Sequence, residues 1–143
     1  MKILLINGPN LNMLGTREPE KYGSTTLKDI ENELAAYAEK FGAELDCFQS
    51  NHEGELIDKI QAAKDVYDGI ILNAGGYTHT SVALRDAVAA IGIPVVEVHM
   101  TNIHAREEFR HISLLSGVCA AQVVGFKAAS YRLALDGIMG LLK

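Results

Sequence analysis

The sequence predicts a single α/β domain, residues 1–143, built around a parallel β-sheet with helices on both faces. Short β-rich runs alternate with longer amphipathic stretches, and most of these runs are apolar throughout, as is typical of strands buried on both faces. The chain has 143 residues, of which 48% are hydrophobic and 22% charged. That length is enough for one domain with a core and too short for two, and the composition argues against disorder.

The first half of the chain contains three expected strands and two expected helices. Residues 3–6 form the first strand, residues 45–48 a weaker second one and residues 69–72 the third. Between the first two strands, an apolar stripe with helical spacing predicts a helix that Gly42 ends; its members are Leu27, Ile30, Leu34, Tyr37, Ala38 and Phe41. A second helix face follows in Leu56, Ile57, Ile60 and Ala63.

The second half repeats this alternation. Thr80 or Ser81 is expected to cap a helix whose apolar face is Val82, Leu84, Ala87, Val88 and Ile91. Residues 94–98 form a fourth strand that begins with a proline, residues 118–124 form a fifth, and a last helix covers about residues 128–142. Five buried strands alternating with helices imply right-handed crossovers, and at this length a flavodoxin-like, doubly wound arrangement is expected.

Charge and composition exclude several functions. The formal net charge is −5 and the Lys and Arg residues are scattered, so a nucleic-acid partner is not expected. No apolar run approaches the length that spans a membrane, and the run at residues 2–6 is too short for the core of a signal peptide. Cys47 and Cys119 lie in apolar runs without metal or redox spacing, as expected of buried thiols in a reducing compartment. We therefore expect a cytoplasmic protein.

The connection after the first strand is unusually long for an α/β unit. In such sheets ligands bind beyond the carboxyl ends of the strands, so this connection, residues 7–23, lies at the expected ligand end. It is rich in amides, Gly and Pro, and we interpret about residues 10–23 as a lid. Taken alone, Arg17 and Tyr22 would be an exposed charge and a loop anchor, but their place in this loop favours a role in the site.

The connection after the third strand, residues 73–81, begins with Asn73 and contains paired glycines. Gly75 and Gly76 permit unusual backbone angles and a close approach to a ligand, and the start of the next helix offers N–H donors suited to an anion. Asp86 lies two helical turns after His79, on roughly the same face. A plain strand-to-helix turn and a solvated surface pair explain these residues equally well.

The connection after the fourth strand contains the clearest chemical signal. Glu97 and His99 point to the same side because strand side chains alternate, and a carboxylate that orients an imidazole suits a general acid. A structural ion pair is the alternative, but a polar pair among Pro and Val costs burial energy unless it is used. Arg106 and Arg110, one helical turn apart, are expected to face one ligand. None of the five histidines has metal-ligand spacing, so no metal site is expected.

Several short motifs occur in a fixed order along the chain, and the ordered set indicates a protein family more specifically than any single motif. They are NGPNLN at residues 7–12, REP at 17–19, YG at 22–23, QSNHEG at 49–54, EVH at 97–99 and FR at 109–110. This ordered set resembles the type II 3-dehydroquinate dehydratases, and the resemblance covers almost the whole chain. Ala74 stands where that family often has proline, and Thr101 stands where serine is usual and keeps the hydroxyl.

The resemblance implies a flavodoxin-like subunit of a homo-oligomer, a dodecamer built from trimers. It implies dehydration of 3-dehydroquinate to 3-dehydroshikimate by anti elimination through an enolate, with no cofactor and no metal. The reaction would serve the shikimate pathway of aromatic amino acid biosynthesis or the breakdown of quinate.

The resemblance also implies a role for each matched residue. Tyr22 would take the proton next to the ketone, and Arg17 would hold Tyr22 as its anion, with Arg106 nearby. Ionising an ordinary tyrosine near neutral pH costs roughly 4 kcal/mol. One arginine at about 4 Å supplies roughly that much. His99, oriented by Glu97, would protonate the departing hydroxyl.

The remaining matched residues would bind the substrate. Asn73 and the backbone of Met100 and Thr101 would bind the carboxylate, and His79 and Arg110 would bind the ring hydroxyls. Asn10 would help to place a water at the enolate oxygen. Asp86 would lie at a subunit contact near the site.

Two functions of other classes are the alternatives. A flavodoxin-like flavin or phosphate binder needs a loop rich in Ser, Thr and Gly after the first strand, and residues 7–23 do not have that composition. A receiver-type signalling module needs acidic residues at the ends of strands one and three, where this chain has Asn7 and Asn73. Both therefore rank below the dehydratase.

Overall fold

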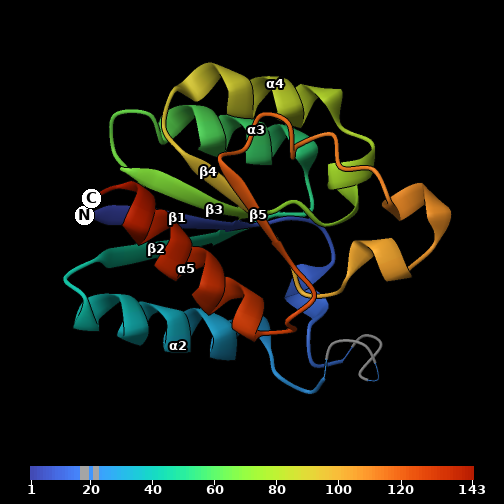
Figure 1. Cartoon of the computed structure of the whole chain (residues 1–143), viewed down its shortest axis with the longest axis horizontal. Coiled ribbons are helices and arrows are strands. Elements are labelled where there is room, and N and C mark those ends of the chain that lie inside the picture. The colour runs from blue at the N-terminus through green and yellow to red at the C-terminus, as the bar shows by residue number, and fades with distance from the viewer. Residues whose placement is uncertain (17–19, 21–22) are drawn as a thin grey trace.

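A five-stranded, all-parallel sheet forms the centre of the fold, in the order β2-β1-β3-β4-β5 (Figure 1). The computed structural model describes residues 1–16, 20 and 23–143. The strands are β1 (Lys2–Asn7), β2 (Glu44–Gln49), β3 (Gly69–Asn73), β4 (Val95–His99) and β5 (Ala121–Val124). The sheet and its helices confirm the predicted flavodoxin-like α/β fold.

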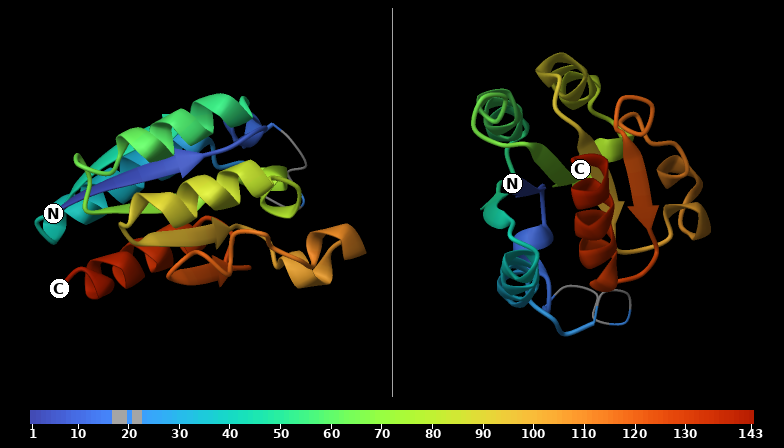
Figure 2. Two further views of the ribbon diagram at one scale, coloured as in Figure 1. Left: turned by 90° about the horizontal axis from the view of Figure 1, so that it is seen from above. Right: turned by 60° about the vertical axis from the view of Figure 1, so that its left-hand side comes forward.

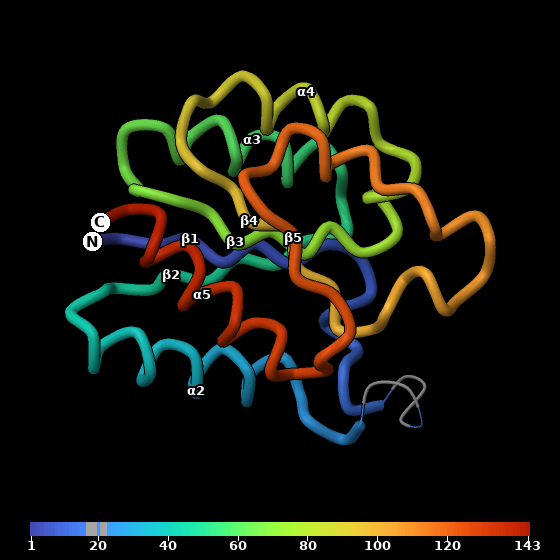
Figure 3. The backbone as a smooth tube through the Cα atoms, viewed as in Figure 1, coloured from blue at the N-terminus to red at the C-terminus, as the bar shows by residue number. Residues whose placement is uncertain are grey.

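Two helices cover each face of the sheet. The helices α2 (Leu27–Lys40) and α5 (Ala129–Leu141) lie on one face, and α3 (Glu53–Ala62) and α4 (Val82–Ile91) lie on the other, as Figures 1 and 2 show. Figure 3 follows the same path and places both ends of the chain together, away from the carboxyl ends of the strands. Within the described residues, no helix is long and apolar enough to cross a membrane.

The apolar runs of the central strands follow from this two-sided burial. Successive strand side chains point to opposite faces, so Ile3 and Leu5 pack beneath α2 and α5, while Leu4 and Ile6 pack beneath α3 and α4. All four side chains are fully buried. A strand covered on both faces therefore needs apolar residues at every position, and β1 has them.

Local capping groups set where the helices begin. Thr26 and Asp29 form a reciprocal capping box at the start of α2, in which each side chain accepts the other's backbone N–H at 3.1 Å. Of the two caps predicted for α4, Ser81 is the one used, and its Oγ accepts the Leu84 N–H at 2.9 Å. Thr80 lies one residue outside.

The start of the fifth strand and the expected helix after the fourth strand need correction. The fifth strand begins at Ala121 rather than at Val118, because the N–H groups of Val118 and Cys119 both donate to the Leu115 carbonyl in a turn. The two arginines after β4 do not share an α-helix. The chain there forms two short 3₁₀ turns, η3 (Ile103–Ala105) and η4 (Glu108–Arg110).

The register of the strands brings their polar carboxyl ends to one edge. Asn7 of β1 pairs with Asn73 of β3, and His99 of β4 pairs with Val124 of β5. Asn7, Asn73 and Glu97 are at most 3% exposed, and His99 is 6% exposed. Buried polar side chains gathered at the carboxyl edge of a parallel sheet mark the place to look for a ligand site.

Candidate active site

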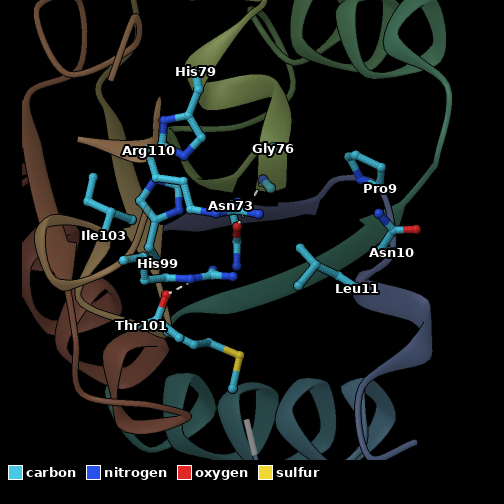
Figure 4. A pocket seen from close by; sticks show the side chains of 13 residues that line it. Pro9, Asn10, Leu11, Asn73, Gly76, His79, His99, Thr101, Ile103 and Arg110 are labelled. Atoms are coloured by element: carbon cyan, nitrogen blue, oxygen red, sulfur yellow. Dashed lines mark hydrogen bonds between the residues drawn. The ribbon is translucent and has the colours of Figure 1, made fainter. Parts of the chain in front are cut away.

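A pocket of about 130 Å³ opens at this edge of the sheet (Figure 4). Its wall comes from the connections that follow β1, β3 and β4 and contains Pro9, Asn10, Leu11, Asn73, Gly75, Gly76, His79, His99, Met100, Thr101, Ile103, Arg106 and Arg110. Of the predicted site residues, Asn10, Asn73, His79, His99, Met100, Thr101, Arg106 and Arg110 are thus brought together. Arg17 and Tyr22 lie outside the described residues.

Glu97 and His99 form a buried pair behind the pocket wall. Glu97 is fully buried, and its Oε2 lies 2.6 Å from His99 Nε2. Ser113 Oγ donates to both carboxylate oxygens at 2.8 and 2.9 Å, and Gln122 Nε2 donates to Oε1 at 3.1 Å. Thr78 Oγ1 lies 3.4 Å from both Glu97 Oε2 and His99 Nε2.

These donors decide the protonation state of Glu97. Burial alone would raise the pKa of the carboxyl group, but the hydrogen bond and positive charge of His99, with the hydrogen bonds from Ser113 and Gln122, hold that pKa below its ordinary value of 4.5. Glu97 is therefore a carboxylate at neutral pH. Because it binds Nε2 of His99, it leaves Nδ1 as the ring nitrogen that can exchange a proton with a ligand.

His79 presents the opposite chemistry. Its Nδ1 lies 2.9 Å from the Ile112 carbonyl, an acceptor, so Nδ1 carries the proton and Nε2 is left as an acceptor. Burial, and the positive charges of His99 and Arg110, lower the pKa of His79, although the Ile112 carbonyl works against them. The rings of His79 and His99 are stacked with centroids 6.4 Å apart. The pocket thus holds one imidazole tied to a carboxylate and one neutral imidazole.

Two arginines supply the positive side of the pocket. Arg110 Nε donates to Glu107 Oε1 at 3.1 Å, and Arg106 Nε lies 3.6 Å from the same oxygen. Arg106 also donates from Nη1 to Thr101 Oγ1 at 3.4 Å. The hydroxyl group that threonine shares with serine therefore accepts a hydrogen bond from this arginine. Figure 4 shows Arg110 beside His79 and Asn73, pointing into the pocket. Two guanidinium groups on one wall suit an anionic or hydroxyl-rich ligand.

The loop after β1 is held in shape by the QSNHEG motif at residues 49–54. Asn10 has a left-handed backbone (φ 71°), and its N–H donates to Asn51 Oδ1 at 3.0 Å. Gln49 Nε2 donates to the Gly8 carbonyl at 3.1 Å. Gly75 has φ +60°, so the predicted unusual backbone angle is confirmed at this one of the two glycines, and a Cβ there would lie 3.1 Å from the Pro9 carbonyl oxygen.

Other expectations for the connection after β3 need correction. A 3₁₀ turn, η2 (Gly75–His79), separates β3 from α4, so His79 and Asp86 do not share a helix. The start of α4 is closed by Ser81, whose Oγ also donates to Glu53, and no α4 residue lines the pocket. Asp86 is exposed on α4, outside the pocket of this single chain.

Sequence reasoning missed the groups that hold Glu97. Gln122 faces Glu97 across the β4–β5 register and is the one polar residue of β5, a signal that could have identified it. Ser113 and Thr78 lie in irregular chain and a 3₁₀ turn, where no periodicity marks them. Among the described residues, no three His, Cys, Asp or Glu side chains are grouped to hold a metal ion.

Comparison with known proteins agrees with this geometry. The family model of class II dehydroquinases matches residues 1–139. A 3-dehydroquinate dehydratase of Bacillus mycoides is 56% identical over 142 residues, 99% of this chain and 97% of that protein. The crystal structure of the type II dehydroquinase from Butyrivibrio crossotus superposes with a TM-score of 0.95 at 48% identity, covering 97% of each chain.

A second solved structure extends the likeness to lower identity. The type II dehydroquinase of Propionibacterium acnes has a TM-score of 0.92 at 35% identity and covers 99% of this chain and 95% of its own. The chain belongs to the class II dehydroquinase family.

Proposed function

We propose that this chain is a hydro-lyase that removes water from 3-dehydroquinate to give 3-dehydroshikimate, a step of the shikimate pathway. Family membership supports the reaction. The observation that carries it in the structure is the buried Glu97–His99 pair at a pocket that two arginines also line. A positioned acid and an anion-binding wall are what dehydration of a carboxylate-bearing substrate requires.

In the proposed mechanism His99 is the acid. The enolate of the substrate expels its hydroxyl group as the C–O bond breaks, and the proton on His99 Nδ1 passes to that oxygen, so that water leaves. Glu97 stays ionised and stabilises the positive charge on the imidazole while His99 holds the proton to be donated. The resemblance assigns the first proton abstraction to Tyr22, held as its anion by Arg17; both lie outside the described residues.

The proposed binding roles follow the chemistry of each wall. Asn73 and the backbone of Met100 and Thr101 would bind the carboxylate, since all three residues line the pocket. His79 Nε2 would accept a hydrogen bond from a ring hydroxyl, because Nδ1 already serves the Ile112 carbonyl. Arg110 would bind a second hydroxyl, and Asn10 would bind a water at the enolate oxygen. Arg106 would lie at the side of the ring where the enolate forms.

The experiment that tests this function is incubation with 3-dehydroquinate while the absorbance of the conjugated enone is followed. We expect the absorbance to rise with wild-type protein and to rise far more slowly with Glu97→Gln, which keeps the size of the side chain and loses its charge. No increase with the wild type would contradict the function.

Covalent catalysis is a separate question. Dehydration next to a ketone can also proceed through a lysine Schiff base, but no lysine is among the described residues that line the pocket. Borohydride added with the substrate should therefore leave the protein unlabelled. A trapped adduct on any lysine would overturn the enolate mechanism while leaving the overall reaction in place.

We also propose that the chain works as a cytoplasmic homo-oligomer, a dodecamer built from trimers. The exposed apolar side chains of Phe109, Ile112 and Phe126, each at least 60% exposed, support an association of copies. Asp86, exposed on α4, would lie at a subunit contact. Light scattering should give a large symmetric particle, and a stable, fully active monomer would contradict the proposal.

A further inference from the structure

One buried hydroxyl group behind the pocket has no part in the mechanism above. Tyr131 of α5 is 1% exposed, and its hydroxyl lies between two amides at the carboxyl ends of neighbouring strands. Tyr131 Oη donates to Asn7 Oδ1 at 2.6 Å and accepts from Asn73 Nδ2 at 2.8 Å. Asn7 and Asn73 are register partners on β1 and β3, so the sheet fixes the spacing of these two amides.

The direction of these hydrogen bonds decides how the Asn73 amide is turned. A tyrosine hydroxyl has one proton, and here Asn7 Oδ1 takes it, so Tyr131 can offer only a lone pair to Asn73. At the other end of the amide, the Gly75 N–H donates to Asn73 Oδ1 at 3.1 Å. A flipped Asn73 would place its NH₂ group against the Gly75 donor and its oxygen against the Tyr131 oxygen. Only one orientation satisfies both neighbours.

That orientation leaves one hydrogen available to a ligand. Asn73 Nδ2 carries two hydrogens, one of which goes to Tyr131, and residues 1–16, 20 and 23–143 provide no second acceptor for this group. Asn73 lines the pocket, and Figure 4 shows it between Gly76 and His99. Burial raises the pKa of Tyr131, so its hydroxyl stays protonated and the hydrogen-bond direction holds over the working pH range.

We propose that Tyr131 is a positioning residue that turns the Asn73 amide N–H toward the substrate carboxylate, with Asn7 as the group that sets the direction of the Tyr131 hydroxyl. The inference rests on the proposed function, because it assigns the carboxylate to Asn73. It makes the pocket selective for an acceptor at this position, since a fixed N–H donor rejects a group that would also donate.

The test is Tyr131→Phe, which keeps the ring and removes only the oxygen. We expect KM for 3-dehydroquinate to rise about tenfold, the value of one hydrogen bond to a charged group, while kcat changes much less. The matched control is Tyr37→Phe on α2, whose hydroxyl donates to Asp136 of α5 at 2.8 Å and is remote from the pocket; its KM should stay at the wild-type value.

A ligand pair separates the proposed role from general loosening of the site. Quinate, which lacks the ketone and cannot react, and quinamide, in which the carboxylate is replaced by an amide, are titrated calorimetrically against each variant. If Tyr131 acts through the carboxylate, Tyr131→Phe weakens quinate about tenfold and quinamide much less. Equal losses for both ligands, or no loss for either, would overturn the inference.

A second variant covers the case in which Tyr131→Phe does not fold. Asn7→Leu leaves Tyr131 in place, keeps the branched shape of the side chain and removes the acceptor that directs the hydroxyl, so it should weaken quinate more than quinamide in the same way. If the wild type turns over 3-dehydroquinate but the variants keep its KM and its dissociation constants for quinate and quinamide, only the inference is refuted. A wild-type protein without turnover would refute the proposed function.

Discussion

The two halves of the pocket are built in different ways. The strand half, with Glu97 and His99, is fixed by sheet register and by buried hydrogen bonds, and Glu97 is 0% exposed. The arginine half after β4 is held by Glu107, whose side chain is 48% exposed. Breaking a buried pair leaves an uncompensated charge and costs about 3–5 kcal/mol, whereas an exposed ion pair contributes about 0–1 kcal/mol.

This difference in burial separates the groups that carry out the chemistry from the groups that bind the substrate. His99, which must transfer the proton, is held at Nε2 by Glu97, and Glu97 is held in turn by Ser113, Gln122 and Thr78. The two arginines, which only attract the substrate, are held by a more exposed group. We therefore expect changes at Glu97, His99 and their partners to lower kcat and changes in the arginine half to alter KM; Asn73, although it ends a strand, belongs with the binding groups.

The largest effect is expected from His99→Ala. Removal of a positioned acid should lower kcat about 10²–10⁴-fold, with a much smaller change in KM. Steady-state kinetics with 3-dehydroquinate measure both, and His52→Ala, an exposed histidine before α3, is the control. Near-normal turnover would remove His99 from the acid role.

A smaller loss is expected from Ser113→Ala, which removes the hydroxyl shared by both oxygens of Glu97. We expect kcat to fall about tenfold and the free energy of unfolding at neutral pH to fall by about 1–3 kcal/mol. Ser113→Thr should restore most of both. Ser116→Ala, which removes the hydroxyl that donates to the Ser113 carbonyl and leaves the contacts of Glu97 in place, is the matched control.

The pH dependence of that stability loss tests its cause. Glu97 has a folded-state pKa below 4.5, so its ionised form stabilises the protein above the unfolded pKa, and this contribution is lost as pH falls through the folded pKa. The difference in unfolding free energy between wild type and Ser113→Ala, measured with urea, should narrow as the pH falls below 4.5. Ser113 Oγ also accepts the N–H groups of Leu115 and Ser116 at 3.2 and 3.0 Å. A difference in unfolding free energy that stays constant with pH would mean that Ser113 acts only through this turn.

A severalfold effect on KM is expected from titration of His79. Burial keeps its pKa below 6.5, so it is neutral and accepts through Nε2 at pH 7. As the pH falls well below 6.5, Nε2 becomes a donor and KM should rise. In His79→Gln that rise should be absent from KM profiles recorded between neutral and acidic pH. A Gln variant with the wild-type profile would assign the titration to another group.

The smallest effect is expected from Glu107→Gln. Because an ion pair with an exposed partner is weak, loss of the Glu107 charge should raise KM only a few fold and leave kcat nearly unchanged. The effect should shrink further in high salt. Glu108→Gln is the neighbouring control. A fall in kcat as large as that of Ser113→Ala would erase the distinction between the two halves of the pocket.

The same contrast explains what could be predicted from the sequence. The strands and their order of appearance follow from local apolar runs, and strand alternation alone brings Glu97 and His99 to one side. The cap of α4 was narrowed to Thr80 or Ser81 because a hydroxyl residue before an apolar stripe is a local signal, and Ser81 is the one used. These predictions depend on neighbours a few residues apart, which a single sequence contains.

Contacts between distant segments could not be predicted in this way. Tyr131 reads as one more apolar position on the buried face of α5, and nothing local indicates that its hydroxyl meets Asn7, 124 residues away. Ser113 reaches Glu97 from irregular chain, where the path depends on tertiary packing. The arginine spacing suggested a helix because 3₁₀ turns give no distinct periodicity in three residues.

The central place of β1 has a consequence for how the chain is made. β1 lies between β2 and β3 although it precedes both, and the Lys2 N–H donates to Asp68 Oδ2 across 66 residues. At about 5–20 residues per second, the apolar stretch that becomes β1 waits several seconds on the ribosome before both partner strands emerge. Until then its backbone has no sheet to join. We therefore expect the nascent protein to depend on chaperones more than its modest size suggests, and its refolding to be slowed by these non-local pairings.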